Sequence, residues 1–386
     1  MKYWRGYLAA GLLGAITWAM MEFAKANTVL VDMIYPYFTR LIQNTLADWS
    51  AGAAFCLWQV LAVMLIVIVI ATVVLMILLK WNFVQWLGWV LAGGMLIFTM
   101  HTGIYGLNSY AGPLSDDIRL HVADHPYDTT ELAEATIYFR DMANELATQI
   151  PRDEAGKPQY PSFSEMANAA GEGFRTLTYE YSYAVFAGST APVKELGWAD
   201  WFTSMGITGI TMPLTGEAAV NPNIPVVSIP FTMCHEMAHR MCISYERDAN
   251  LAAFLACRVH EDPVFQYSGY FMAFRYCYNA LVSVGTSAAS NAANQIYNGI
   301  NDQLRGDLAD YKAYFAANMD DKASDFAGSV NDTYIKVSGD DQGTASYGQV
   351  CDLLVSWYIQ EIYMPEHQDE IEQFDPLDKD QVGLGG

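Results

Sequence analysis

The sequence predicts an α-helical membrane anchor followed by a mainly helical (α+β) domain that contains a small sheet. Two observations support this fold class. Residues 49–79 carry no charged side chain, and about 20 apolar residues are enough for a helix to cross the hydrocarbon core of a bilayer. After residue 105 helical periodicity dominates, except between residues 207 and 227, where Gly, Thr, Pro and Val in short alternating runs predict one or two strands.

Composition supports this division of the chain. Of the 386 residues, 53% are apolar and 16% are charged, whereas an ordinary soluble domain has roughly a quarter charged residues. Five of the 20 basic and three of the 42 acidic residues precede residue 105, so the remainder carries a net charge of −24. Such a surface repels nucleic acid, which excludes a nucleic-acid partner. The six cysteines form no CxxC pair, so they indicate neither a zinc ribbon nor a disulfide scaffold.

The anchor is expected to cover residues 1–104, with three membrane-spanning helices over about 6–23, 52–79 and 81–101. A cleaved signal peptide is the alternative for the first span, but a retained helix is favoured because no convincing small-residue cleavage site follows it. Residues 29–49 have helical spacing and are expected to lie along the membrane interface. The lipid bilayer is therefore an expected partner of this chain.

Basic residues near the spans predict the topology. Those on one side of the predicted bundle are Lys2, Arg5 and Lys80, and those on the other are Lys25 and Arg40. The positive-inside rule then favours a cytoplasmic N-terminus. With three spans, residues 105–386 would lie outside the cytoplasm, as part of a multi-pass protein of the cell membrane.

The second domain is expected over residues 105–363, followed by an acidic tail, 364–386, that reads as disordered. Capping-box spacing at Asp128 and Glu131 predicts a helix over 129–150, and Ser162 with Glu165 predicts another that runs to about 186. Further helices are expected from Pro230 onward, over 245–261 and 263–284, and on to about 363.

The sequence His235-Glu236-Met237-Ala238-His239 lies on one of these predicted helices. A spacing of four places both imidazoles on one helix face, where they can bind one Zn²⁺. Glu236 would then act as the general base that takes a proton from the attacking water. The same pattern could also occur on a surface helix with two unrelated histidines.

A catalytic zinc site needs a third protein ligand, and Glu246 is the candidate because it opens the next predicted helix after a short turn. Asp248 is a rival that points elsewhere on that helix. Asn250 lies one helical turn beyond Glu246 and could hydrogen-bond the distal nitrogen of a ligand histidine. A solvated carboxylate at a helix start is the alternative reading of Glu246.

These residues resemble the gluzincin pattern, with HExxH followed by ExxAN. The short gap between His239 and Glu246 resembles an uncharacterised bacterial family of three-span membrane proteins with a zincin-like domain. Further matching segments are residues 106–110, 213–218, 267–270, Tyr334 and 346–348, so the resemblance spans roughly residues 30–363. One departure is Cys242, where that family usually has Gly.

The resemblance implies a zincin-like metallopeptidase domain with zinc as cofactor and a peptide or protein as substrate. Strand residues 209–220 could align an extended peptide. Weaker candidates for transition-state stabilisation are Tyr267, His260, Arg305 and Tyr347. Two other functions stay open: a zinc-binding membrane sensor or regulatory protein with little or only self-directed proteolysis, and a zinc-retaining pseudoenzyme, against which the presence of Glu236 argues.

Overall fold

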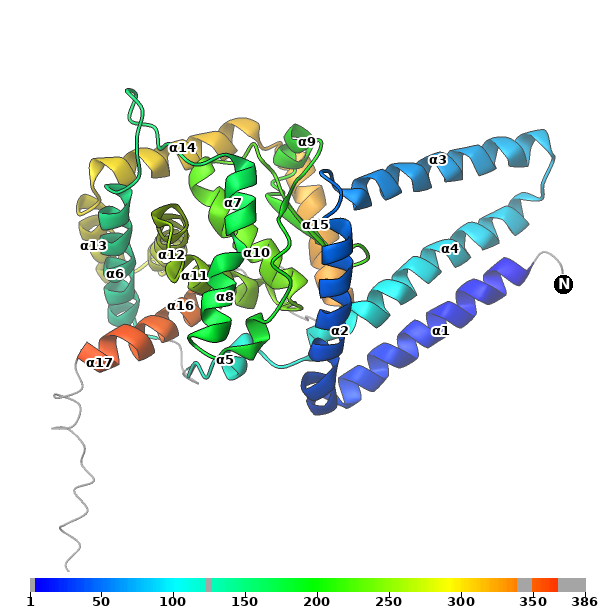
Figure 1. The fold of residues 1–386 in the computed structure, drawn as a ribbon, viewed down its shortest axis with the longest axis horizontal. Coiled ribbons are helices and arrows are strands. Elements are labelled where there is room, and N and C mark those ends of the chain that lie inside the picture. The colour runs from blue at the N-terminus through cyan, green and yellow to red at the C-terminus, as the bar shows by residue number, and fades with distance from the viewer. Residues whose placement is uncertain (1–3, 123–126, 339–348, 367–386) are drawn as a thin grey trace, which may run out of the picture.

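The computed structural model describes residues 4–122, 127–338 and 349–366, and these form a mostly helical structure (Figure 1). The first four helices are α1 (Arg5–Ala26), α2 (Thr28–Ser50), α3 (Leu57–Leu78) and α4 (Phe83–Ile104). The domain contains η2 (Gly106–Tyr110), α5 (Leu114–Asp117), α6 (Thr129–Ala147), α7 (Phe163–Ala169), α8 (Gly171–Tyr179), η3 (Ala184–Phe186), α9 (Ala199–Ser204), η4 (Val226–Ser228), α10 (Ile229–Arg240), α11 (Glu246–Arg258), α12 (Pro263–Ser283), α13 (Ser287–Asn298), α14 (Asp302–Asn318), α15 (Asp321–Ser338), α16 (Val350–Tyr358), η6 (Ile359–Tyr363) and α17 (Met364–Glu366). Most of the predicted acidic tail, residues 367–386, lies outside the described residues.

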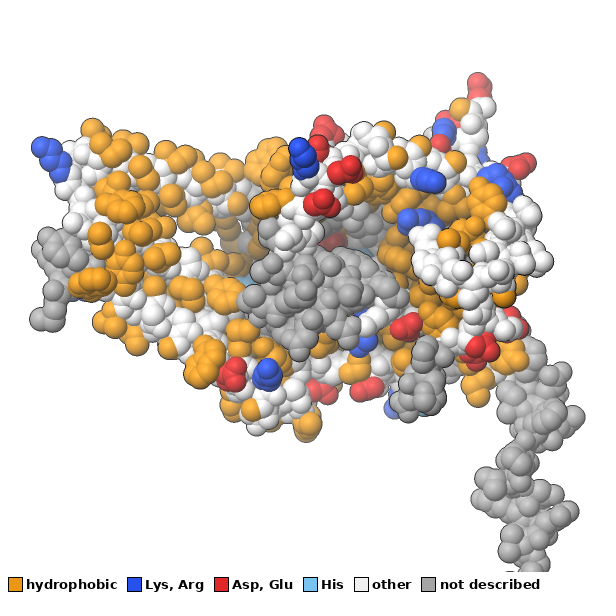
Figure 2. All heavy atoms as spheres, turned by 180° about the vertical axis from the view of Figure 1, so that it is seen from behind, with side chains coloured by type: hydrophobic (Ala, Val, Ile, Leu, Met, Phe, Trp, Pro, Cys, Tyr) orange, Lys and Arg blue, Asp and Glu red, His pale blue; other side chains and the backbone are white. Residues whose placement is uncertain are grey.

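Three helices, α1, α3 and α4, are long and apolar enough to cross a membrane. They project from one side of the domain, and Figure 2 shows hydrophobic side chains covering them while charged side chains gather over the domain. This arrangement is consistent with a multi-pass membrane protein. The spans differ from the predicted ones by up to five residues at an end; for example, α3 begins at Leu57 because residues 51–55 form a turn.

The helices α1 and α4 pack along their length through small residues. A side chain on Gly6 would lie only 2.6 Å from the backbone nitrogen of Trp89, so the two backbones can approach closely only because this position is glycine. The hydroxyls of Thr17 and Thr99 are 2.8 Å apart across the same interface. Small residues and interhelical hydroxyl contacts are the usual means by which membrane helices associate.

Helix α2 runs across the ends of the three apolar helices and packs on the domain (Figure 1). Its inner face is polar and buried: Arg40 donates to the Met241 carbonyl at 3.2 Å, and Gln43 donates to the Pro213 carbonyl at 3.1 Å. Its outer face exposes a helical series of large apolar side chains, namely Val29, Met33, Tyr37 and Leu41. A helix with these two faces suits the interfacial position expected for residues 29–49.

A buried ion pair joins the apolar helix α3 to the sheet. Lys194 lies 2.7 Å from Glu217, and the Glu217 carboxylate also accepts hydrogen bonds from the backbone N–H groups of Leu57 and Trp58 at 2.7 and 2.8 Å. N–H groups in the first turn of a helix have no acceptor within that helix, so Glu217 supplies one for each of these two. A carboxylate at this end also interacts favourably with the helix dipole. Lys194 in turn donates to the Ser50 carbonyl at 2.7 Å. Glu217 therefore caps the apolar helix α3 from within the domain.

The sheet has three strands in the order β1-β3-β2: β1 (Lys194–Glu195), β2 (Gly209–Met212) and β3 (Glu217–Val220). Strand β2 pairs antiparallel with β3, with Ile210 opposite Ala219, and both fall within the predicted strand region. Strand β1 pairs parallel with β3 and was not predicted, because two residues carry no periodicity. Helix α10 packs against β2 and β3.

The domain core is formed by α6, α10, α11 and α12, in which α12 packs against each of the other three. Both predicted capping boxes are present, at Asp128 with Glu131 and at Ser162 with Glu165. The helical region after Ser162 ends at Tyr179, short of residue 186, and the chain turns at Ser182, where φ is 59°. All six cysteines are buried and free, and two pairs, Cys234–Cys257 and Cys277–Cys351, have sulfur atoms 3.7 Å apart.

Candidate metal centre

The turn after α10 determines where the third candidate ligand lies. The N–H of Cys242 donates to the His239 carbonyl at 2.9 Å, and the N–H of Ile243 donates to the Ala238 carbonyl at 3.2 Å, the two bonds of a Schellman cap. This cap requires a left-handed residue, and Cys242 has φ of 71°. Glycine would adopt this conformation without strain. Cys242 adopts this conformation although it is not a glycine, so the tight turn is present and α11 begins at Glu246.

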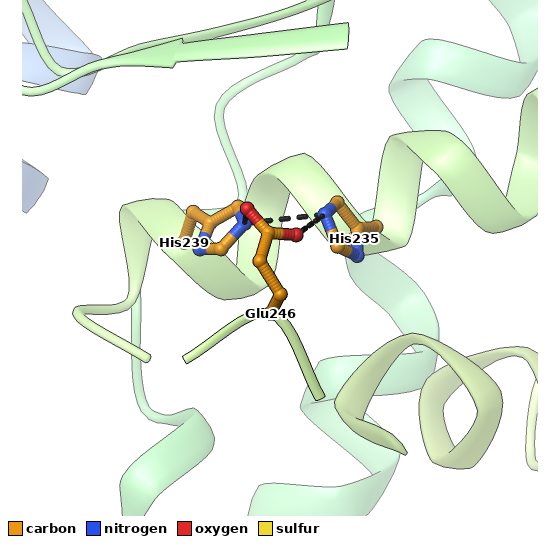
Figure 3. Close-up of side chains that lie close together, drawn as sticks. All are labelled: His235, His239 and Glu246. Atoms are coloured by element: carbon orange, nitrogen blue, oxygen red, sulfur yellow. Dashed lines mark hydrogen bonds and ion pairs between the residues drawn. The ribbon is translucent and has the colours of Figure 1, made fainter. Parts of the chain in front are cut away.

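His235, His239 and Glu246 converge on one point (Figure 3). The Nε2 atoms of the two histidines are 3.1 Å apart. The carboxylate of Glu246 lies 3.3 Å from Nε2 of His235 and 3.6 Å from Nε2 of His239. The two distances to Glu246 involve different carboxylate oxygens, Oε2 for His235 and Oε1 for His239. Ligands about 2.0–2.2 Å from a tetrahedral ion lie roughly 3.3–3.5 Å from one another, so the three side chains could hold such an ion.

The ring orientation of His239 is fixed by a backbone group. Nδ1 of His239 lies 2.8 Å from the carbonyl oxygen of Ile243, which can only accept, so this nitrogen carries a proton and Nε2 faces His235 and Glu246. Asn250, expected to bond a ligand histidine, instead donates to the backbone carbonyl of Glu246 at 2.8 Å, and its own Oδ1 accepts from Tyr276 at 3.0 Å. Asn250 therefore positions the Glu246 backbone, and the partner of His239 is the Ile243 carbonyl.

The charges in this cluster stabilise one another. Burial alone would lower the pKa of His239, but the Glu246 carboxylate outweighs it and raises that pKa to about 9. Burial would likewise raise the pKa of Glu246, yet the charge of His239 and hydrogen bonds from both histidines hold it well below its usual range. The rival carboxylate, Asp248, lies outside the cluster, where it accepts a hydrogen bond from the Leu114 N–H at 2.9 Å.

Glu236 is buried between α10 and β2. Its carboxylate accepts a hydrogen bond from the Thr211 hydroxyl at 2.8 Å. Burial raises its pKa, and the two neighbouring histidines and Thr211 only partly offset this. Gly209 leaves room for the carboxylate, since a side chain there would lie 2.5 Å from Oε1 of Glu236. A glycine within a strand signals such a close approach, but the sequence does not reveal what approaches.

The cluster lines a cleft of about 930 Å³. Its lining also comes from β2, from the end of α4, from α9 and from the first half of α15. The described lining includes several residues that sequence reasoning did not assign: His101, Tyr105, Thr211, Ser244 and Tyr245. For His101 a signal existed, because an ionisable residue in a membrane span often has a function.

The weaker candidates lie elsewhere. Tyr267 is fully buried and donates to Asp307 at 2.6 Å. His260 is buried, stacks on Phe265 and lies 3.1 Å from the Ala169 carbonyl, and Arg305 covers the ring of Tyr297. None of Tyr267, His260 and Arg305 lines the cleft. Their side chains contact other residues of the helical domain instead. Tyr347 lies outside the described residues.

The fold and the cluster define a mostly helical protein with three apolar N-terminal helices and a two-histidine, one-glutamate site that lines a cleft. Residues 31–355 match the family described as protein of unknown function (DUF3810), and the chain belongs to this family. Neither the curated proteins nor the solved structures gave a match to the chain.

Proposed function

We propose that this chain is a membrane-anchored zinc-dependent hydrolase, in which His235, His239 and Glu246 hold the metal. The observation that carries the proposal is the convergence of three Lewis bases whose atoms lie 3.1, 3.3 and 3.6 Å apart. Two imidazole acceptors and a carboxylate at these separations repel one another unless a proton or cation lies between them. Two nitrogens and one oxygen are also a common ligand set for catalytic zinc.

A zinc ion at this position would act as a Lewis acid and lower the pKa of water. Glu236 is the proposed general base: its carboxylate is buried, and a raised pKa lies nearer to neutral pH, where proton transfer is most effective. The Thr211 hydroxyl holds the carboxylate in one orientation through its 2.8 Å hydrogen bond. Protons taken up by Glu236 can then pass to the leaving group.

A peptide is the substrate class that the cleft suits best. Strand β2 lies at the edge of the described sheet, and its residues Gly209–Met212 line the cleft beside Glu236. An unpaired strand edge offers backbone N–H and C=O groups to which an extended peptide can add as a further strand. The proposed enzyme is therefore a zinc metallopeptidase of the gluzincin type.

The apolar helices give the proposed location. Arg5 and Lys80 lie at the end of the helices far from the domain, and Lys25 and Arg40 lie near it. A cytoplasmic position for Arg5 and Lys80 follows the positive-inside rule. The domain with its cleft would then face the outside of the cell membrane.

The central test is metal content. Full-length protein purified in detergent is expected to contain one zinc per chain, measured by mass spectrometry of the metal, and His239→Ala is expected to contain almost none. Removing zinc with a chelator should lower the midpoint of thermal unfolding, because zinc at 1,000 times its Kd stabilises the folded state by about 4 kcal/mol. A chain that purifies without zinc and takes up none on dialysis would contradict the proposal. Bound zinc without cleavage of a peptide library would favour a sensor or regulatory protein.

Replacing Gly209 by Ala should reduce peptide cleavage about 100-fold, because displacing a catalytic group by about 1 Å can have this effect. The new methyl group would press on the Glu236 carboxylate. Gly328→Ala is a matched control: this glycine also lines the cleft, but a side chain there meets nothing within 4 Å. The rates of peptide cleavage are measured on zinc-loaded protein. Equal cleavage rates for Gly209→Ala and Gly328→Ala would show that catalysis does not depend on the position of the Glu236 carboxylate beside β2.

A further inference from the structure

The cleft above the metal centre is built partly from a membrane helix. His101 in the last turn of α4 and Tyr105 just after it line the cleft, together with Gly106 and Ser109 of η2. Helix α15, which forms another wall, also contacts η2. In the proposed topology α4 leaves the hydrocarbon at this point, so the cleft begins at the surface of the bilayer.

The rim of the cleft carries exposed aromatic side chains. Trp201 of α9 is 59% exposed and Phe326 of α15 is 69% exposed, and both line the cleft. The end of α9 is joined to the residue that precedes α15, because the Asp320 N–H donates to the Ser204 carbonyl at 3.0 Å. Exposed aromatic residues next to membrane helices are typical of the headgroup region, where one part of the ring system contacts lipid and another contacts water.

The chemistry of the lining favours a polypeptide over a phospholipid. Among the described residues that line the cleft there is no Lys or Arg, and the acidic ones are Glu236 and Glu246 of the site itself. Lipid phosphates are bound by Arg and Lys, which pair with the phosphate oxygens. A neutral chain that pairs through its backbone with β2 needs no such cation.

From this placement we infer that the substrate is a juxtamembrane peptide: an extended, mostly uncharged segment that directly follows or precedes the membrane-spanning helix of another protein. The inference rests on the proposed function for the identity of the cutting site. A substrate held in the same bilayer would reach the cleft along the surface, between Trp201 and Phe326, and lie against β2. Tethering to the bilayer also raises its effective concentration at the cleft to the millimolar range, as a short linker does.

Photo-crosslinking tests this inference without requiring cleavage. Full-length protein with Phe326→p-benzoylphenylalanine is placed in lipid nanodiscs with a pooled library of polypeptides. Each has one membrane-spanning helix and a neutral, randomised stalk of about 12 residues, which spans roughly 40 Å when extended. The same stalks without the helix are supplied in solution in a parallel sample. The control carries the photoreactive residue at Tyr179, which is 80% exposed on α8 and does not line the cleft.

We expect tethered stalks to crosslink at position 326 about tenfold or more over free stalks and over the Tyr179 control. Equal labelling of free and tethered stalks, labelling of neither above the control, or adducts with lipid alone would overturn the inference. Zinc content and cleavage are measured on unmodified protein in the same nanodiscs. Bound zinc with equal cleavage of both libraries would overturn the inference and leave the hydrolase intact. Selective capture of tethered stalks by a protein without zinc would overturn the hydrolase alone.

Discussion

Replacing Glu236 by Gln is expected to lower the rate of peptide cleavage by about 10²–10⁴-fold while the zinc content stays at one per chain. The amide keeps the size of the side chain and can still accept the hydrogen bond from Thr211, but it cannot take up a proton. This range is the usual contribution of a general base. Initial cleavage rates on a peptide library, together with metal analysis, measure both quantities.

The stability of this variant separates catalysis from folding. Because burial raises the pKa of Glu236, its charged form is disfavoured in the folded state, and a neutral amide should leave the midpoint of thermal unfolding unchanged or higher. Thr211→Ser, which retains the hydroxyl, is the matched control and should keep most of the activity. A Glu236→Gln protein that cleaves at the normal rate would remove Glu236 from the mechanism, and one that loses zinc would make Glu236 part of the metal centre.

The second large effect is expected on stability, from Glu217→Ala. This change leaves Lys194 without its carboxylate in a buried position, and it removes the acceptor from two N–H groups at the start of α3. Loss of one partner from a buried ion pair typically costs about 3–5 kcal/mol. The midpoint of thermal unfolding in detergent should therefore fall well below that of the unaltered protein.

Glu195→Ala is the control for this prediction, because Glu195 is the exposed neighbour of Lys194 on the same strand. Its loss should change the unfolding midpoint very little, as is usual for exposed substitutions. Equal midpoints for the Glu217 and Glu195 variants would mean that the contact between the sheet and α3 does not hold the two parts together.

Local patterns in the sequence predicted much of this fold. The uncharged run of residues 49–79 predicted α3, and the capping boxes at Asp128 and Ser162 predicted the starts of α6 and α7. Each of these signals is contained in a few neighbouring residues. The role of Glu217 is different, because its partners at Leu57 and Trp58 lie 160 and 159 residues away. A strand carboxylate gives no sequence signal that it will cap a distant helix.

The same distinction applies to the site. The spacing of His235, His239 and Glu246 identified the cluster, since all three lie on two consecutive helices joined by a tight turn. The partner of His239 is a backbone carbonyl, at Ile243, which any residue could supply. Asn250 had a suitable spacing, but the direction of its side chain depends on packing against α12 through Tyr276. His101 reaches the cleft only through the tertiary placement of α4.

The position of α2 sets an order of events during biosynthesis. Residues 28–50 are made well before their partners: the Met241 carbonyl that Arg40 binds lies 201 residues later, and the Pro213 carbonyl that Gln43 binds lies 170 residues later. Until then the polar face of α2 is hydrated, and the apolar face can hold the helix on the lipid surface. Helix α2 is therefore made before α10, the helix that carries His235 and His239 and later packs against it. A shortened protein that begins at residue 105 would lack α2 as well as the three apolar helices.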